Sequence, residues 1–463
     1  MVSLFRTFLL CILLVGCHHD SDETSSVPTA FNLTSIEPIK GAVKSFDFQW
    51  QESEFADSYT LCQKAVLVSH ECEPILENIA ASATSVTIAL ERILNDDTFF
   101  ILAKNSVGTA KSSELTISPD LIQSSIGFIK PQINDSLDAF GQSIAISENG
   151  LTLAVGALQE SSNTRGINGN EADNSNPLSG AVYVFQRQGS TWRQNAYLKA
   201  SNNDALDAFG FSLSLNFDGT LLLVGAPGEA GKSTGIDGDA NDNSASYSGA
   251  SYLFERNGES WTQLHYIKAS NPDINDSFGY DVSMSRDGTK FAIGAPGEAS
   301  ASMGINNVQS DNSKADSGAV YVFSEDSGFK QEAYLKASNV NASDRFGYDI
   351  NLDASGDLLA VGSPHESSST SGVQGDELLN DAPLSGAVYL FKKEANEWQQ
   401  ENYIKATNTD AGDNFGQSLA LSGAGENLAV GATKESSDVT LNSSQTNAPL
   451  DNTLPSSGAV YSY

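Results

Sequence analysis

Short apolar runs alternate with clusters of polar turn residues along most of the chain, and from about residue 126 this pattern repeats. A Phe-Gly pair marks the repeat, at Phe140, Phe209, Phe278, Phe346 and Phe415, with steps of 69, 69, 68 and 69 residues. A long fixed period predicts supersecondary units that are stacked or arranged radially. The region from 126 to 463 is therefore one unit repeated five times.

Each unit contains four runs with the length and composition of β-strands, which in the second unit cover 209–215, 221–225, 250–254 and 261–268. The first two runs of the first four units are separated by Asn-Gly, Asp-Gly or Ser-Gly, which are typical of tight hairpins. No helical period of useful length interrupts the units. Four-stranded antiparallel units repeated radially predict a β-propeller, whose closed ring protects the strand edges.

The two ends of the repeat region predict how the ring closes. The fourth run begins with tyrosine, leucine or isoleucine, and lysine, at 197–199, 266–268, 334–336 and 403–405. Phe128, Ile129 and Lys130 stand one period before the first copy, whereas the last unit ends at Tyr463 without a fourth run. We therefore predict an all-β chain with a five-bladed propeller in which this N-terminal strand completes the last blade. An open solenoid, the alternative, would leave both edges unpaired.

A smaller β-sandwich is predicted over 30–119. Alternating runs at 45–50, 59–61, 86–90 and 99–103 are bounded by Gly, Asn, Asp or Ser. The early Trp50, the Tyr59-Thr60-Leu61 run and the segment 103–108 before a last strand resemble a fibronectin type III module. A generic immunoglobulin-like sandwich is the alternative.

The N-terminus predicts export and lipid anchoring. Arg6 precedes a short apolar core that is too short to span a bilayer, so residues 1–16 are interpreted as a signal peptide. Leu14-Val15-Gly16-Cys17 resembles the lipobox of bacterial lipoproteins, which implies cleavage before Cys17, acylation of that cysteine and, with no aspartate after it, an outer-membrane location. The alternative is an ordinary secretory signal with an incidental cysteine. The polar residues 17–29 are expected to be a disordered tether.

Charge and cysteines add two expectations. Cys62 and Cys72 are expected to form a disulfide, because an exported chain meets an oxidising compartment. The net charge is −33 although only 18% of the residues are charged. This scarcity of basic residues argues against nucleic acid and anionic lipid surfaces as partners, so membrane contact is expected through the lipid alone.

The repeat resembles the FG-GAP repeat of integrin α-subunit head domains and their bacterial relatives. It combines Phe209-Gly210 with the segment 224–227, which reads Val-Gly-Ala-Pro. The resemblance implies a propeller, with adhesion or ligand binding as its role. The calcium loop of that family lies between the first two strands, and here Leu222 and Phe291 take the place of its final carboxylate. Calcium needs that ligand among its six to eight oxygens, so this site is not expected here.

Oxygen-bearing side chains gather instead in the long loop between the second and third runs. In the second unit Asp237, Asp239, Asn241 and Asp242 alternate around a glycine. Oxygen side chains in this pattern can coordinate calcium, which is the one cofactor that the sequence suggests. The counterparts in the first and third units are Asn168, Asn170, Asp173 and Asp311. The alternative is an Asx-rich loop whose side chains cap its own turns.

Three charged residues recur in all five units, and this repetition predicts a structural role because a catalytic site is usually singular. We expect them to cap turns and to pair between neighbouring blades. They are Asp138, Asp207, Asp276, Asp344 and Asp413; Glu160, Glu229, Glu298, Glu366 and Glu435; and Lys130, Lys199, Lys268, Lys336 and Lys405.

Enzyme chemistry finds little support. His70, His265 and His365 lie in different domains or units, no His/Cys cluster has metal-ligand spacing, and no G-x-S-x-G motif is present. We therefore predict a non-enzymatic, lipid-anchored envelope protein for adhesion or for recognition of an unidentified protein or glycan. The alternatives are a periplasm-facing scaffold for envelope assembly and a propeller hydrolase or lyase, which would need a singular acidic or histidine cluster at the channel mouth.

Overall fold

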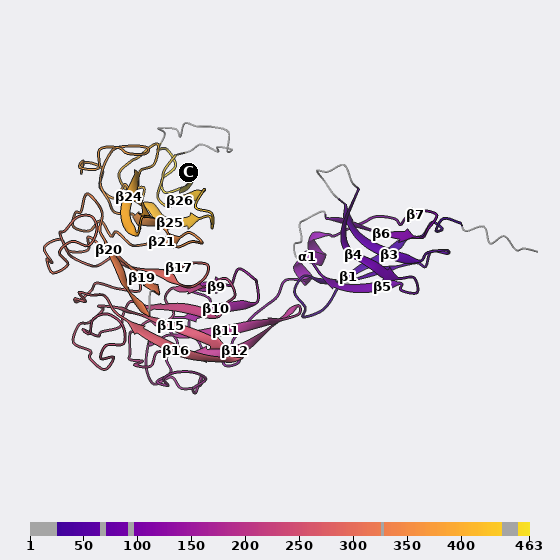
Figure 1. Cartoon of the computed structure of the whole chain (residues 1–463), viewed down its shortest axis with the longest axis horizontal. Coiled ribbons are helices and arrows are strands. Elements are labelled where there is room, and N and C mark those ends of the chain that lie inside the picture. Colours follow the sequence, from indigo (N-terminus) through magenta and orange to yellow (C-terminus); the bar gives the residue numbers. More distant parts are fainter. Residues whose placement is uncertain (1–25, 65–70, 91–96, 326–327, 438–451) are drawn as a thin grey trace, which may run out of the picture. The chain divides into compact units, whose positions relative to one another are not determined.

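The computed structural model describes residues 26–64, 71–90, 97–325, 328–437 and 452–463. The signal peptide, Cys17 and His70 lie outside these residues. The chain divides into two compact units, Met1–Phe128 and Ile129–Tyr463 (Figure 1). Within the described part of the chain, no helix has the length and apolarity needed to cross a membrane.

Unit 1 is a β-sandwich. One sheet contains β1 (Leu33–Pro38), β2 (Ser45–Trp50) and β5 (Ser85–Ala89); the other contains β3 (Ser58–Lys64), β4 (Cys72–Ala80), β6 (Thr98–Lys104), β7 (Thr109–Lys111) and β8 (Leu115–Thr116). Along β2, Phe46, Phe48 and Trp50 alternate with polar residues and are buried in the core, as a strand with one covered face requires. The unit closes with the short helix α1 (Pro119–Ser124), whose first turn is capped by Ser118.

A disulfide joins Cys62 on β3 to Cys72 on β4, with the two Cα atoms 5.1 Å apart. The two cysteines are 10 positions apart in the sequence, so the disulfide closes a short loop. Cys62 is fully buried, so the cross-link ties the edge strand β4 to the core of the sandwich.

Unit 2 consists of five antiparallel sheets, four of them four-stranded. The first contains β9 (Ile144–Ile146), β10 (Thr152–Ala157), β11 (Ala181–Gln188) and β12 (Thr191–Leu198); the second β13 (Leu213–Leu215), β14 (Leu221–Ala226), β15 (Ala250–Asn257) and β16 (Ser260–Ile267). The third contains β17 (Val282–Met284), β18 (Lys290–Ala295), β19 (Ala319–Glu325) and β20 (Phe329–Leu335); the fourth β21 (Ile350–Leu352), β22 (Leu358–Ser363), β23 (Ala387–Glu394) and β24 (Glu397–Ile404). The fifth contains β25 (Phe415–Leu421), β26 (Leu428–Ala432) and β27 (Ala459–Ser462).

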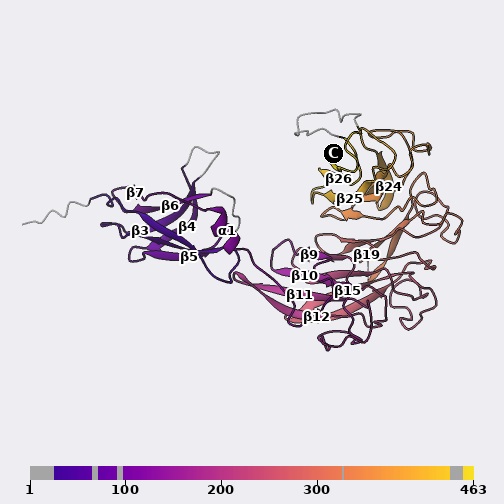
Figure 2. The same cartoon turned by 180° about the vertical axis from the view of Figure 1, so that it is seen from behind.

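The first strands of successive sheets contact one another, from β9 through β13, β17 and β21 to β25. They form the inner side of unit 2, while β16 and β20 lie toward its periphery (Figures 1 and 2). These sheets are those expected of propeller blades and confirm the predicted all-β architecture.

The Phe-Gly pair joins neighbouring sheets. Phe209 is fully buried against Tyr252, with ring centroids 5.3 Å apart, and its backbone bridges to Gly180 of the preceding sheet. The second strand also carries a glycine at its next-to-last position, because the next sheet passes very close. A Cβ at Gly225 would overlap the backbone carbonyl oxygen of Gly279.

The last sheet differs from the prediction, because it has three strands and residues 128–130 are not a strand. Phe128 is 86% exposed, and Ile129 packs against the first sheet. A strand requires a hydrogen-bonded neighbour, and among the described residues none pairs with this segment or with the free edge of β27. Closure of the ring is therefore not shown.

Candidate functional site

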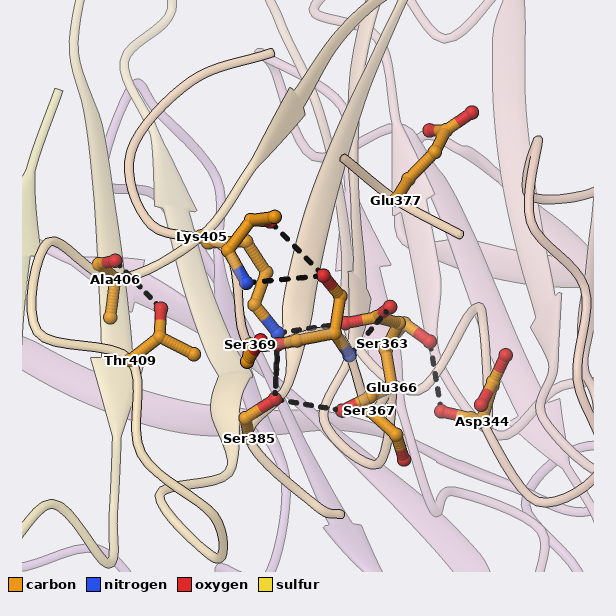
Figure 3. A network of polar contacts seen from close by, with 12 residues as sticks. Asp344, Ser363, Glu366, Ser367, Ser369, Glu377, Ser385, Lys405, Ala406 and Thr409 are labelled. Carbon is orange, nitrogen blue, oxygen red and sulfur yellow. Dashed lines mark hydrogen bonds and ion pairs between the residues drawn. The ribbon is translucent and has the colours of Figure 1, made fainter. Parts of the chain in front are cut away.

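The recurring lysines and glutamates form a buried network inside each of the first four sheets. In the fourth sheet the Lys405 Nζ lies 2.8 Å from the Glu366 Oε2 and 2.7 Å from the Ser385 Oγ (Figure 3). The same contacts, at 2.7–2.8 Å, join Lys199 to Glu160 and Ser179, Lys268 to Glu229 and Ser248, and Lys336 to Glu298 and Ser317. The prediction that these charges pair between neighbouring blades is wrong, because both partners of each pair belong to one sheet.

Burial and pairing act on these groups in opposite directions. Burial lowers the pKa of each of the four lysines, and the adjacent glutamate partly restores it. Burial likewise raises the pKa of Glu160, against the attraction of Lys199. Since both side chains of each pair are almost fully buried, each of them needs the opposite charge of the other in order to stay charged. The network is structural.

Neighbouring sheets are linked by an asparagine that follows the fourth strand. The Asn202 Nδ2 donates to the Glu229 Oε1 at 3.1 Å, and the Tyr252 hydroxyl donates to the Asn202 Oδ1 at 2.8 Å. Asn271, Asn339 and Asn408 make the same pair of contacts in the later units.

The aspartates before each Phe-Gly cap a turn, which confirms that part of the prediction. The Asp207 Oδ2 accepts the backbone N–H of Asp204 at 2.8 Å, and the other four repeat this contact. Burial raises the pKa of Asp207 and Asp276 to about 8, that of Asp344 to about 7 and that of Asp413 to about 6. In the folded protein these four carboxyl groups therefore lose their protons at a higher pH than an ordinary aspartate does.

The side chains suggested as calcium ligands in the second repeat of unit 2 turn toward separate partners. The Asp237 carboxylate contacts the His265 Nδ1 at 2.8 Å and accepts the backbone N–H of Tyr266 at 3.0 Å. Asp239 accepts the backbone N–H of Asn241 at 3.0 Å, and Asp242 accepts that of Ser244 at 3.0 Å.

Their counterparts in other units do the same. Asn168 accepts the N–H of Tyr197, Asn170 that of Ala172, Asp173 those of Asn163 and Ser175, and Asp311 that of Ser313. No group of three or more His, Cys, Asp or Glu residues that could hold a metal ion occurs in the described ranges. The loops therefore fit turn capping, and calcium binding in them stays a prediction.

The hairpins between the first two strands also use their carboxylates in the turn. The Asp218 Oδ1 accepts the backbone N–H of Thr220 at 3.1 Å, and the Asp287 Oδ1 accepts that of Thr289 at 3.0 Å. This agrees with the expectation that these loops are plain hairpin turns.

The inner side of unit 2 breaks the fivefold regularity. The two residues after each Phe-Gly are Gln142-Ser143, Phe211-Ser212, Tyr280-Asp281, Tyr348-Asp349 and Gln417-Ser418. Only the third and fourth units carry an aromatic residue together with an acidic one. These positions do not belong to the residues that recur in all five repeats, and their change of residue type against a constant background is the sequence signal for them.

A cavity of about 310 Å³ lies on the inner strands and is lined by Ser143, Ile144, Phe211, Ser212, Leu213, Tyr280, Asp281, Tyr348 and Asp349. Phe211, Tyr280 and Tyr348 form a continuous aromatic row along it. The ring centroids are 4.9 Å apart in each of the two successive pairs. Asp281 and Asp349, both half-buried, complete the cavity wall.

The two aspartates are electrostatically coupled. Burial raises the pKa of both, and the charge of Asp281 raises that of Asp349 further. One oxygen of Asp281 accepts the backbone N–H of Ile350 in the next sheet at 2.8 Å. Two carboxylates so placed are poised to gain a proton or to bind a cation.

Comparison with known proteins places the chain in a family. The sequence model of the FG-GAP repeat matches residues 192–254, 261–323, 329–391 and 398–463, more than half of the chain. The chain belongs to the FG-GAP repeat family. Each matched segment begins in the fourth strand of one sheet and continues into the third strand of the next. The family's repeat therefore spans the junction between two sheets.

No curated protein matches the sequence. Among solved structures, the periplasmic gluconolactonase of Pseudomonas aeruginosa is 11% identical over 80% of this chain and 75% of its own, with a TM-score of 0.36. Saccharomyces cerevisiae Sqt1 is 10% identical over 65% and 71%, with a TM-score of 0.32. The FN3tt mutant is 16% identical over 20% and 92%, with a TM-score of 0.16. These likenesses are too distant to indicate a function.

Proposed function

We propose that this FG-GAP protein is a lipid-anchored recognition protein of the outer membrane, and that its inner cavity binds a basic side chain of a protein ligand. FG-GAP propellers are typical of binding proteins. The observation that carries the proposal is the aromatic–acidic lining at Tyr280, Asp281, Tyr348 and Asp349. Two of the five repeats have this combination and three lack it.

The chemistry of the lining favours a cation. Aromatic faces attract lysine and arginine head groups, and a cation relieves the repulsion between two partly desolvated carboxylates. Bridging to the next sheet does not itself require a carboxylate. In the first two units Ser143 and Ser212 make such a bridge by donating to a glycine carbonyl, at 2.6 and 3.0 Å. The bridge alone therefore does not explain the carboxylates at Asp281 and Asp349, which supports a role toward a ligand.

The decisive experiment is calorimetry with trilysine as the probe and its Nε-acetylated form as the neutral control. The parent should bind trilysine, and Asp281→Asn with Asp349→Asn should weaken binding at least tenfold, about 1.4 kcal/mol. The matched control, Asp218→Asn with Asp287→Asn, removes the same charge from two hairpin turns and should bind as the parent does. Equal binding of the acetylated peptide, or unchanged binding by the cavity variant, would contradict the proposal.

Anchoring is tested separately. Replacement of Cys17 by serine should release the protein from the membrane fraction, because acylation at that residue is the proposed attachment. A variant that still sediments with membranes after high-salt washing would refute it. Protease digestion of intact cells distinguishes a surface-exposed binding protein from a periplasm-facing scaffold.

A hydrolase or lyase is the second candidate, and the pairing of Asp281 with Asp349 favours it. Two coupled carboxyl groups can share one proton, as an acid–base pair does. Turnover of a glycan or peptide that is lost in both Asp281→Asn and Asp349→Asn would favour catalysis, whereas binding without product would favour recognition.

A further inference from the structure

The strand β5 of unit 1 has an outer edge without a partner. It is the last strand of the sheet β1-β2-β5, and no strand in the described residues pairs with its other side. The backbone N–H of Leu90 donates to the carbonyl oxygen of Lys44 beside β2, so every second residue of β5, counted back from Leu90, bonds to β2. The residues between them direct their backbone N–H and C=O groups to the free edge; they are Ser85, Thr87 and Ala89.

β5 also lacks the features that keep edge strands from pairing with other chains. The edge strand β4 of the opposite sheet carries Glu73, Pro74 and Glu77, and its pairing with β3 shifts register twice. β7, the other edge of that sheet, carries Lys111. β5 has the sequence Ser-Val-Thr-Ile-Ala, without charge or proline, and pairs with β2 in an unbroken register. Of these three edges, β5 is the one suited to accept a further strand.

A cavity of about 630 Å³ lies between β5 and β4. Its apolar lining includes the half-buried Ile75 on β4 and Ile88 on β5, and the buried Leu90. Val86 and Ile88 face the core, whereas the residues that alternate with them on β5 are exposed. A strand paired with β5 would continue this inner face, so every second side chain of the occupant would reach the cavity. These side chains should therefore be apolar.

The outer face of the same sheet carries unbalanced negative charge. Glu37 on β1 lies directly opposite Asp47 on β2, and Asp47 lies opposite Thr87 on β5. Like charges at opposed positions repel. Asp47 accepts the Gln49 amide at 2.8 Å and the Thr87 hydroxyl at 3.1 Å, and neither carboxylate has an ion pair within the part of the chain that the structure describes. The next position in this row belongs to a strand beside β5, where a lysine or arginine would reach toward Asp47.

We propose that the free edge of β5 binds an extended, basic segment of a partner protein as an added antiparallel strand. Its apolar side chains enter the cavity beside Ile88, and its basic side chains lie with Thr87 on the outer face. An antiparallel arrangement follows the other strand pairs of unit 1. A second copy fits less well, because each chain has a net charge of −33 and would add another Asp47 to the same face. This site lies in unit 1 and does not depend on the function proposed for the inner cavity of unit 2.

Fluorescence anisotropy with the fluorescein-labelled peptide Lys-Val-Lys-Val-Lys-Val-Lys tests the site. The full chain should carry Asp281→Asn and Asp349→Asn, so that the inner cavity of unit 2 does not contribute. Adding Thr87→Pro should weaken binding at least tenfold, because proline removes the N–H at the free edge and its ring occupies the place of the added strand, while the bonds to β2 remain.

The matched control is Thr109→Pro, which places proline on β7, where the N–H of Thr109 faces away from β6. This variant has the same charge and should bind as the parent does. The melting transition of unit 1 verifies that both variants are folded. Equal binding by the Thr87→Pro variant would show that the peptide is held by general electrostatic attraction and would overturn the proposal.

A change in the peptide tests the same contact without altering the protein. In antiparallel pairing the residue opposite Thr87 exchanges both hydrogen bonds with it and shares its face of the sheet, so the lysines direct their backbone N–H groups to β5. Methylation of the backbone nitrogens of the lysines should therefore weaken binding at least tenfold, whereas methylation of those of the valines should leave it nearly unchanged. Equal binding by the two methylated peptides would contradict the added strand.

The charge and the choice of occupant have their own tests. Glu37→Gln with Asp47→Asn should weaken binding of the peptide at least threefold, and more at low salt, because the basic side chains lose their counter-charges. Sedimentation of the protein alone should show a monomer with respect to this edge. A dimer that Thr87→Pro dissociates would show that a second copy fills the edge, and this result would also overturn the proposal.

Discussion

The buried network and the inner cavity of unit 2 follow opposite rules. Lysine, glutamate and serine keep their positions in each complete sheet, whereas the residues after the Phe-Gly pair differ between units. Repetition thus marks what every sheet needs in order to fold. The residues that vary within a repeated frame are the ones free to acquire a ligand.

The largest expected effect comes from breaking one buried pair. Glu366→Gln should lower the free energy of unfolding of unit 2 by about 3–5 kcal/mol, because Lys405 would keep a buried charge without its partner. Urea denaturation followed by intrinsic fluorescence measures this change. The double variant Glu366→Leu with Lys405→Met should recover much of the loss, and a single variant as stable as the parent would show that the network is dispensable.

The disulfide of unit 1 should contribute somewhat less. Changing Cys62 and Cys72 to serine should destabilise the sandwich by about 2–4 kcal/mol, since the unfolded chain gains conformational freedom. Calorimetry should show a lower transition for unit 1 only. A shift of the unit 2 transition as well would mean that the two units do not unfold separately.

The pH dependence of stability should reveal the buried aspartates. Asp207 and Asp276 have a pKa of about 8 in the folded protein and about 4 when unfolded, so the folded state binds more protons between these values. Stability should therefore fall as the pH rises from about 4 to 8. Asp207→Asn should reduce this fall by at least about 1 kcal/mol, as measured by urea denaturation at pH 5 and pH 8, while Asp218→Asn should leave it unchanged.

The smallest expected change in stability belongs to the cavity. Asp281→Asn with Asp349→Asn should alter the free energy of unfolding at pH 7 by less than about 1 kcal/mol, because the amides keep an acceptor oxygen while the repulsion disappears. Trilysine binding should nevertheless be lost. A large loss of stability with unchanged binding would assign the two aspartates to the framework instead.

Sequence periodicity predicted the strands of the five sheets, the hairpin turns and the capping aspartates, because these depend on residues close in the chain, but the strand predicted at residues 128–130 is not formed. It misplaced the partners of the lysines, because Glu366 and Lys405 are 39 positions apart and the period alone cannot tell one sheet from the next. The cavity was missed for a related reason. Tyr280 and Tyr348 meet only after folding, when the inner strands of two units come into contact.

The glycine near the end of the second strand has a consequence for how such chains change. At Gly156, Gly225, Gly294 and Gly362 a Cβ would overlap a backbone carbonyl of the following sheet, so main-chain atoms are in direct contact at each of these junctions. This main-chain part of the junction is the same whichever inner side chains the two repeats carry, whereas the links through Asn202 and its counterparts depend on side chains. A repeat can therefore be duplicated with this main-chain contact intact while its inner residues change, as they do between Ser212 and Asp281. Gene duplication followed by substitution at a few inner positions would in this way give a series of similar sheets one side with a specific surface.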